Sequence, residues 1–184
     1  MRPQRVISVA ATALIMAAAA PAFRSAEAQV IRLQANLSGF EEVTPKLTNA
    51  TGEFTAIADA SRTVVTFTLT YADMSTPVRF SHIHFGQQGV NGGIMVFFCN
   101  NTAAGPQPRP CPAQSGGTIE GTFTASDVVG PGSAVPATDQ GIDPGNLSHV
   151  ISAILSGETY VNVHTDRWPG GELRGQVKAN STTR

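Results

Sequence analysis

Charge is scarce in this sequence of 184 residues. Charged residues make up 14% of the chain, with 12 lysines and arginines against 13 aspartates and glutamates, and they form no basic stripe. Proteins that bind nucleic acids present a patch or stripe of positive charge to the phosphates. The composition therefore argues against a nucleic acid as the partner.

Long hydrophobic runs are also absent beyond the first twenty residues. Arg2 and Arg5 precede a short apolar segment over residues 6–20, and Ala26-Glu-Ala28 then supplies the small-x-small pattern that signal peptidase cleaves. The apolar segment is too short for a membrane span, and no later segment is long and apolar enough to form one. These features predict export without a membrane span in the mature chain.

We expect residues 1–28 to be a cleaved signal peptide and residues 29–184 to form a single domain. Removing the first 28 residues leaves nine basic and twelve acidic residues, a mild net charge of −3. Leader segments of this compact kind are commonest in bacteria, so the expected location is the periplasm or the medium.

Cysteine occurs only twice, at Cys99 and Cys111. An even count in an exported chain indicates one disulfide, which closes the loop over residues 100–110. A loop of this length contributes roughly 3 kcal/mol in the chain-entropy model. A catalytic or metal-binding thiol pair is the alternative, and it calls for a reducing compartment or closer spacing.

Alternating apolar and polar residues predict most of the chain to be β-strand. The clearest case covers residues 63–71, where Val65, Phe67, Leu69 and Tyr71 share one side. Strands are expected over residues 30–38, 52–59, 63–71, 78–85, 94–98, 117–125, 158–164 and 172–178. Glycines and prolines make residues 126–146 a long loop.

One segment breaks the β pattern. Between Asn146 and Ser156, five apolar residues recur at helical spacing, with Asn146 or Ser148 as N-cap and Gly157 as the stop. The expected fold is all-β, an antiparallel β-sandwich or open Greek-key-like barrel with this one short α-helix near the C-terminus.

Histidines supply the main chemical clue. Residues two apart on a strand face the same way, so His82 and His84 share a face, as do Asn162 and His164 on a later strand. If the two strands are neighbours, three imidazoles meet and suit zinc or copper, with a fourth position for water or another ligand. Second-shell acceptors are expected from Asn162, Asp166 and Glu172.

Two alternatives stay open for these histidines. A His-x-His pair on a strand is often half-buried and hydrogen-bonded to the protein, without a metal. A two-metal copper–zinc dismutase is excluded because it needs six or more histidines and this chain has four. A single-copper redox site is not excluded.

Arg174 and Gln176 lie on one face of the last expected strand. They form either a polar patch that binds a ligand carboxylate or sugar, or a structural patch in which Arg174 pairs with Glu172 or another acidic residue and covers the sheet.

Several blocks of the sequence resemble the CHRD domain family, named for the repeated domain of the signalling antagonist chordin and common in secreted bacterial proteins. They include Leu37-Ser-Gly-Phe-Glu-Glu-Val43, His82-Ile-His84 with Gly86 and Gly89, Tyr160-Val-Asn-Val-His-Thr165 and Pro169-Gly-Gly-Glu-Leu-Arg-Gly-Gln176. The resemblance spans essentially the whole mature chain. It implies a binding module and transfers no catalytic activity.

The leading expectation is an exported, non-enzymatic binding module whose partner is a protein, a glycan or a metal. The alternatives are a mononuclear copper redox enzyme that uses His82, His84 and His164, and a purely structural or adhesive envelope domain in which these histidines serve packing.

Overall fold

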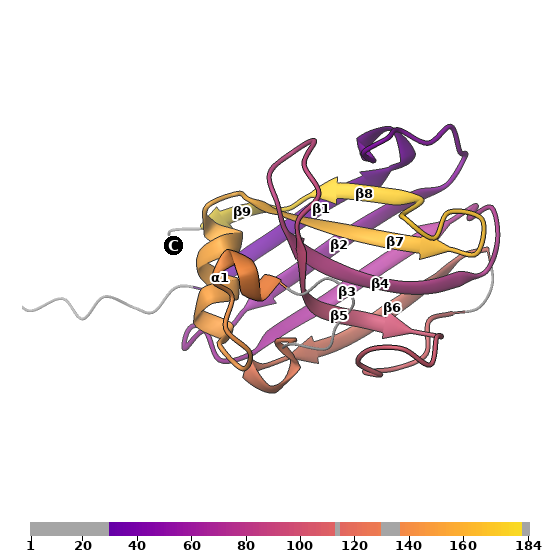
Figure 1. Cartoon of the computed structure of the whole chain (residues 1–184). Coiled ribbons are helices and arrows are strands. Elements are labelled where there is room, and N and C mark those ends of the chain that lie inside the picture. The colour runs from indigo at the N-terminus through magenta and orange to yellow at the C-terminus, as the bar shows by residue number, and fades with distance from the viewer. Residues whose placement is uncertain (1–29, 113–114, 130–136, 182–184) are drawn as a thin grey trace, which may run out of the picture.

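The computed structural model describes residues 30–112, 115–129 and 137–181 (Figure 1). The signal peptide expected over residues 1–28, and residues 130–136 of the expected loop, lie outside the described residues. Within the described ranges, no helix has the length and hydropathy needed to cross a membrane.

The described chain forms one antiparallel sheet that curves into a nearly closed barrel. Its strands are β1 (Ile31–Ser38), β2 (Thr51–Ala58), β3 (Val65–Ala72), β4 (Val78–Phe85), β5 (Gly93–Asn100), β6 (Gly117–Phe123), β7 (Thr159–Thr165), β8 (Leu173–Gln176) and β9 (Lys178–Ser181). The pairing order is β5-β4-β7-β8-β1-β2-β3-β6, with β9 on β1. The expected all-β antiparallel class is confirmed, in its barrel form.

Strands on the two sides of the barrel differ in burial. β1, β2 and β3 alternate between buried and exposed residues, as expected for strands with one face in solvent. β5 and β7 are buried at every position, and β4 at most of them. The interior is filled by aromatic side chains such as Phe54, Phe67 and Phe98, whose ring centroids lie 4.6–6.3 Å apart.

The disulfide between Cys99 and Cys111 is confirmed, with a Cα–Cα separation of 4.9 Å. Its loop lies between β5 and β6, the two strands at the ends of the pairing order. The Asn100 amide donates to the Arg109 carbonyl, and the Arg109 guanidinium donates to the carbonyl of Glu120 on β6. The loop therefore bridges the seam at which the barrel does not close by strand pairing.

The expected helix is α1 (Leu147–Leu155), and Asn146 is its N-cap, accepting from the His149 amide at 3.3 Å. It ends before Gly157, whose φ of +79° suits glycine. The helix packs its buried residues into the main core at one end of the barrel (Figure 1). Leu155, expected within the apolar stripe, is 44% exposed.

Short 3-10 helices occupy three connections: η1 (Gly39–Glu41), η2 (Ala125–Asp127) and η3 (Ala137–Gln140). The third lies in the segment predicted as irregular loop over residues 126–146, and the second begins at Ala125, which was expected as the last residue of a strand. The final strand, expected as one unit over residues 172–178, is divided at Val177. The Val177 amide donates to the Thr159 carbonyl. Before this residue β8 pairs with β7, and after it β9 pairs with β1.

Candidate metal centre

Three of the four histidines meet on the face of β4 and β7 that points away from the main core. These strands are antiparallel neighbours, with Phe80 opposite His164 and His82 opposite Asn162. Opposed residues, and residues two apart, project to the same face. One ring nitrogen each from His82, His84 and His164 lies within 4.8 Å of the others. The strand adjacency on which the sequence argument depended is confirmed.

The path of β4 is irregular where it carries these rings. Its register against β5 shifts between Ser81 and His82, and again between Ile83 and His84. Bulges of this kind re-aim side chains and are over-represented next to functional sites. The His82 ring centroid lies 4.4 Å from that of His84 and 4.6 Å from that of His164.

Two backbone carbonyls hold the rings. Nδ1 of His84 lies 2.8 Å from the Gly92 carbonyl, and Nδ1 of His164 lies 3.0 Å from the Pro169 carbonyl. A carbonyl only accepts, so each Nδ1 is the protonated donor and each Nε2 carries a lone pair. Outer partners of this type fix the tautomer and orientation of metal-binding histidines.

The remaining nitrogens are unusual. Nε2 of His84, Nε2 of His164 and Nδ1 of His82 are buried, and within the described residues they have no hydrogen-bond partner. Leaving a buried polar group unpaired costs about 1–3 kcal/mol, and native structures contain few such groups. Here each histidine of one cluster contributes one unpaired nitrogen, which is a donor set that a metal ion would satisfy.

Aromatic side chains surround the cluster. Phe80 packs against His164 at 4.5 Å between centroids, Phe97 meets His82 edge-on at 5.0 Å, and Tyr160 stacks on His84. The histidines are 1%, 7% and 6% exposed, in chain order. The three rings are therefore largely shielded from solvent.

Burial sets the charge state of the rings. Desolvation lowers the pKa of His82 well below its ordinary value, that of His84 to about 3 and that of His164 to about 4. All three are neutral at pH 7. Neutral imidazole is the form that binds metal, so binding near neutral pH displaces no proton from these rings.

Glu42 is a member of this region that the sequence did not identify. The Asn162 side chain donates to Glu42 at 2.6 Å and to the Leu173 carbonyl at 2.7 Å. Burial raises the pKa of Glu42 to about 7, against the lowering effects of the Asn162 hydrogen bond and the Arg174 charge. The one available signal was its place in the Leu37–Val43 block, which carries no charge pattern of its own.

Arg174 is buried, at 1% exposure, and its contacts agree with the structural alternative rather than with a ligand-binding patch. Its guanidinium donates to the carbonyls of Gln87 and Val90 at 3.0 and 2.8 Å. It also lies 3.4 Å from the centroid of the Tyr160 ring, which is itself parallel to the His84 ring, within 8°. Arg174 thus supports His84 through Tyr160 in a three-layer stack.

Gln176, the second residue of the expected patch, also makes structural contacts. Its side chain donates to the carbonyls of Gly86 and Gly157 at 3.0 and 2.9 Å. Together with Arg174 it binds the β4–β5 loop where that loop crosses β7 and β8 (Figure 1).

The acceptors expected for the rings differ from those observed. Glu172 accepts four hydrogen bonds from Thr48, Ser75 and Thr165, none from a histidine. Asp166 lies 3.9 Å from Arg79 in an exposed pair. Asn162 contacts Glu42 rather than a ring. Loop carbonyls take the expected roles because the loops fold back onto the sheet face.

The arrangement requires glycine at position 92, because a side chain would not fit there. The Gly92 carbonyl accepts from His84 and the Gly92 amide donates to the Tyr160 hydroxyl at 3.2 Å. A Cβ at this residue would lie 1.6 Å from the carbonyl oxygen of Phe85. A single glycine peptide therefore holds both stacked rings.

Comparison with known proteins gives one result. The sequence profile of the CHRD domain matches residues 33–177, which is most of the chain and includes every residue of the cluster. No curated protein and no solved structure matches the chain.

Proposed function

We propose that this chain, which belongs to the CHRD domain family, is an exported, non-enzymatic binding module. In this proposal it holds one zinc or copper ion on His82, His84 and His164. The observation that carries this proposal is the set of three buried ring nitrogens, one per histidine, that have no partner among the described residues.

The donor set fits this class of metal. Three neutral imidazoles suit zinc and copper and leave a fourth position for water or another ligand. Zinc–nitrogen bonds of about 2.0–2.1 Å place tetrahedral ligand atoms roughly 3.3 Å apart. The observed spread of up to 4.8 Å requires small inward rotations of the rings on binding.

The surrounding residues orient the histidine rings and keep water away from them. The Gly92 and Pro169 carbonyls keep the lone pairs of His84 and His164 on Nε2, and Phe80 and Tyr160 pack against these rings. An apolar shell restricts water and strengthens the attraction between the ion and its ligands.

The same geometry separates this proposal from its alternatives. A purely structural role predicts that the buried rings satisfy their nitrogens within the protein, and three nitrogens here do not. A catalytic metal keeps an open position that substrate reaches. Rings that are at most 7% exposed favour a resident ion over turnover.

Export is part of the proposal. We assign residues 1–28 as a cleaved signal peptide and residues 29–184 as the domain, located in the periplasm or the medium. The Cys99–Cys111 disulfide supports this assignment, because such bonds persist in oxidising compartments and are rare in the cytosol.

The test is a titration of the purified, metal-stripped protein with Zn(II), Cu(II) and Cu(I), using calorimetry for the divalent ions and chelator competition for Cu(I). We expect one equivalent of at least one of these metals to bind, and His164→Gln to weaken that binding by about 100-fold or more, because a three-nitrogen site loses one ligand.

His149→Gln is the matched control. His149 is the fourth histidine, on α1, where it lies 3.5 Å from Asp143 and outside the cluster. This variant is expected to bind within about threefold of the parent. The proposal fails if the parent takes up none of the three metals, or if His149→Gln weakens binding as much as His164→Gln does.

A further inference from the structure

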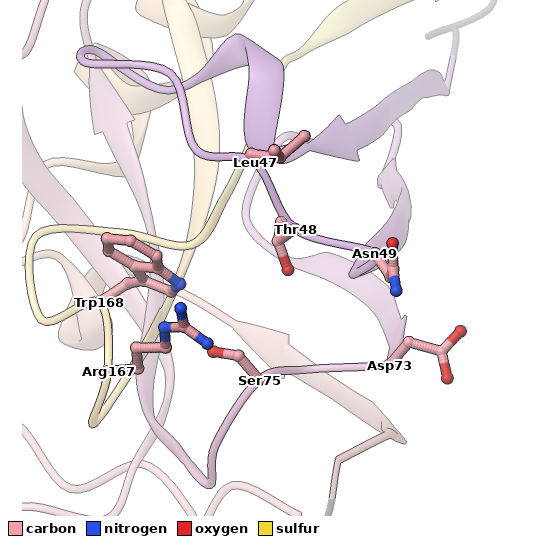
Figure 2. Close-up of a pocket in the computed structure, with 7 residues that line it drawn as sticks. All are labelled: Leu47, Thr48, Asn49, Asp73, Ser75, Arg167 and Trp168. Carbon is pink, nitrogen blue, oxygen red and sulfur yellow. The ribbon is translucent and has the colours of Figure 1, made fainter.

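A second concave site lies at the end of the barrel where three loops meet (Figure 2). These loops join β1 to β2, β3 to β4 and β7 to β8. The pocket has a volume of about 240 Å³ and is lined mainly by polar side chains. Those used below are Thr48, Asn49, Asp73, Ser75, Arg167 and Trp168.

A buried carboxylate holds the three loops in place beneath the pocket. Glu172 is fully buried and accepts from Thr48 at 2.7 Å, from the Ser75 amide at 3.0 Å and hydroxyl at 2.8 Å, and from Thr165 at 2.7 Å. The Arg167 amide adds a bond to Thr76 at 2.9 Å. The walls are therefore fixed before a ligand arrives, which reduces the entropy lost on binding.

One side of the pocket combines an aromatic ring with positive charge. The Arg167 guanidinium carbon lies 5.1 Å from the centroid of the Trp168 ring, and the ammonium of Lys46, which is not one of the lining residues, lies 5.3 Å from it. Arg167 is exposed, and within the described residues no carboxylate lies within ion-pair distance of it. Figure 2 shows its guanidinium directed into the space between Trp168 and Ser75.

The other side presents hydrogen-bonding groups. Figure 2 places Asn49 and Asp73 away from Trp168, across the pocket. The pocket is thus positive beside the ring and negative at the far side.

We propose that this pocket binds an acidic saccharide, a sugar ring that carries a single carboxylate. The apolar face of the sugar lies on the Trp168 indole. Its carboxylate pairs with Arg167, whose planar fork matches carboxylate geometry, and Lys46 adds charge. Its hydroxyls bond Asn49, Ser75 and Asp73, and the charge of Asp73 disfavours a second carboxylate at that side.

Trp168 is the only tryptophan of the chain, so its fluorescence reports directly on the pocket. The probes are the monosaccharide galacturonate, uncharged galactose and acetate. We expect a saturable change with galacturonate, confirmed by calorimetry, and binding at least about tenfold weaker for galactose and for acetate.

Arg167→Gln is the decisive variant, because Arg167 is exposed and its removal leaves the core untouched. It should weaken galacturonate binding by about tenfold or more, whereas Arg62→Gln, at an exposed turn between β2 and β3, should leave binding unchanged. Equal binding of uncharged galactose, equal binding of acetate, no saturable binding, or an unchanged affinity in Arg167→Gln would each overturn the proposal.

Discussion

The two faces of β4 and β7 are both buried, yet they have opposite chemistry. The inner face carries Ile83, Val161 and Val163, which join the main hydrophobic core. The outer face of the same strands carries His82 and His164 together with Asn162 and other polar groups. Residues adjacent in sequence thus alternate between an apolar environment and a polar one.

The two faces differ in what they contribute to the stability of the barrel. Apolar side chains on the inner face stabilise the barrel because folding buries their surface away from water, and any well-fitting hydrophobic residue serves that purpose. The outer face keeps buried nitrogens that have no partner in the part of the chain that the structure describes, and unpaired groups of this kind lower the stability of the metal-free protein. A stability loss of this kind is expected where a site is kept for function.

The largest effect of a single substitution is expected on the inner face. Ile83→Ala removes a fully buried side chain that lies between Val96 and Val161 on the neighbouring strands. It should lower the free energy of unfolding by about 2–5 kcal/mol, measured by chemical denaturation. Metal affinity at 25 °C should stay within about threefold, and a large loss would mean that the two faces are not separable.

Lowering the pH should destabilise the folded protein through the histidines of the outer face. The rings stay neutral in the folded protein well below pH 6.5, whereas the unfolded chain protonates them near that pH. The unfolded state then binds more protons, so stability falls as the pH falls from 6 toward 4. Each ring contributes about 1.4 kcal/mol per pH unit. His82→Leu should reduce the slope by that amount, and an unchanged slope would contradict the assignment.

Glu42→Gln should have a smaller effect of opposite sign. The folded-state pKa of Glu42, about 7, lies above its ordinary 4.5, so stability is lost as the pH rises through this window. The variant keeps an oxygen for Asn162 and has no charge to bury. It should be more stable than the parent by up to about 3 kcal/mol at pH 8 and equal to it at pH 4. Equal stability at pH 8 would show that Glu42 ionises without penalty.

The smallest effect on stability is expected for His82→Leu in the metal-free protein at pH 7.5. The substitution removes an unpaired buried nitrogen and leaves a side chain of similar volume. The free energy of unfolding should change by less than about 1 kcal/mol, whereas metal binding should be lost. A large destabilisation would indicate that the ring serves packing.

Most of the fold could be predicted because it depends on local patterns. Alternation in β1 and β3 and the cap at Asn146 each reflect residues close in sequence. The division between β8 and β9 could not be predicted, because it depends on which distant strand each half pairs with. The Cys99–Cys111 pairing followed from the count of two cysteines and the compartment expected from the leader.

The candidate site was predictable only in its histidines. Period two placed His82 and His84 on one face, and the pairing of β4 with β7 brought in His164. The ring partners Gly92 and Pro169 act through backbone carbonyls, which every residue has and no sequence pattern distinguishes. Glu42 reaches the site from a loop more than a hundred residues away from Asn162 in sequence.

The loop closed by the disulfide affects whether another chain can pair with the edge of the sheet. Among the described residues, β5 and β6 each lack a second neighbour in the sheet, and the Cys99–Cys111 loop lies across that gap. An uncovered strand edge is a template on which another chain can add a strand, and the end point of such growth is a fibril. Because the disulfide closes the loop that covers this edge, we expect its reduction to expose the protein to self-templated aggregation.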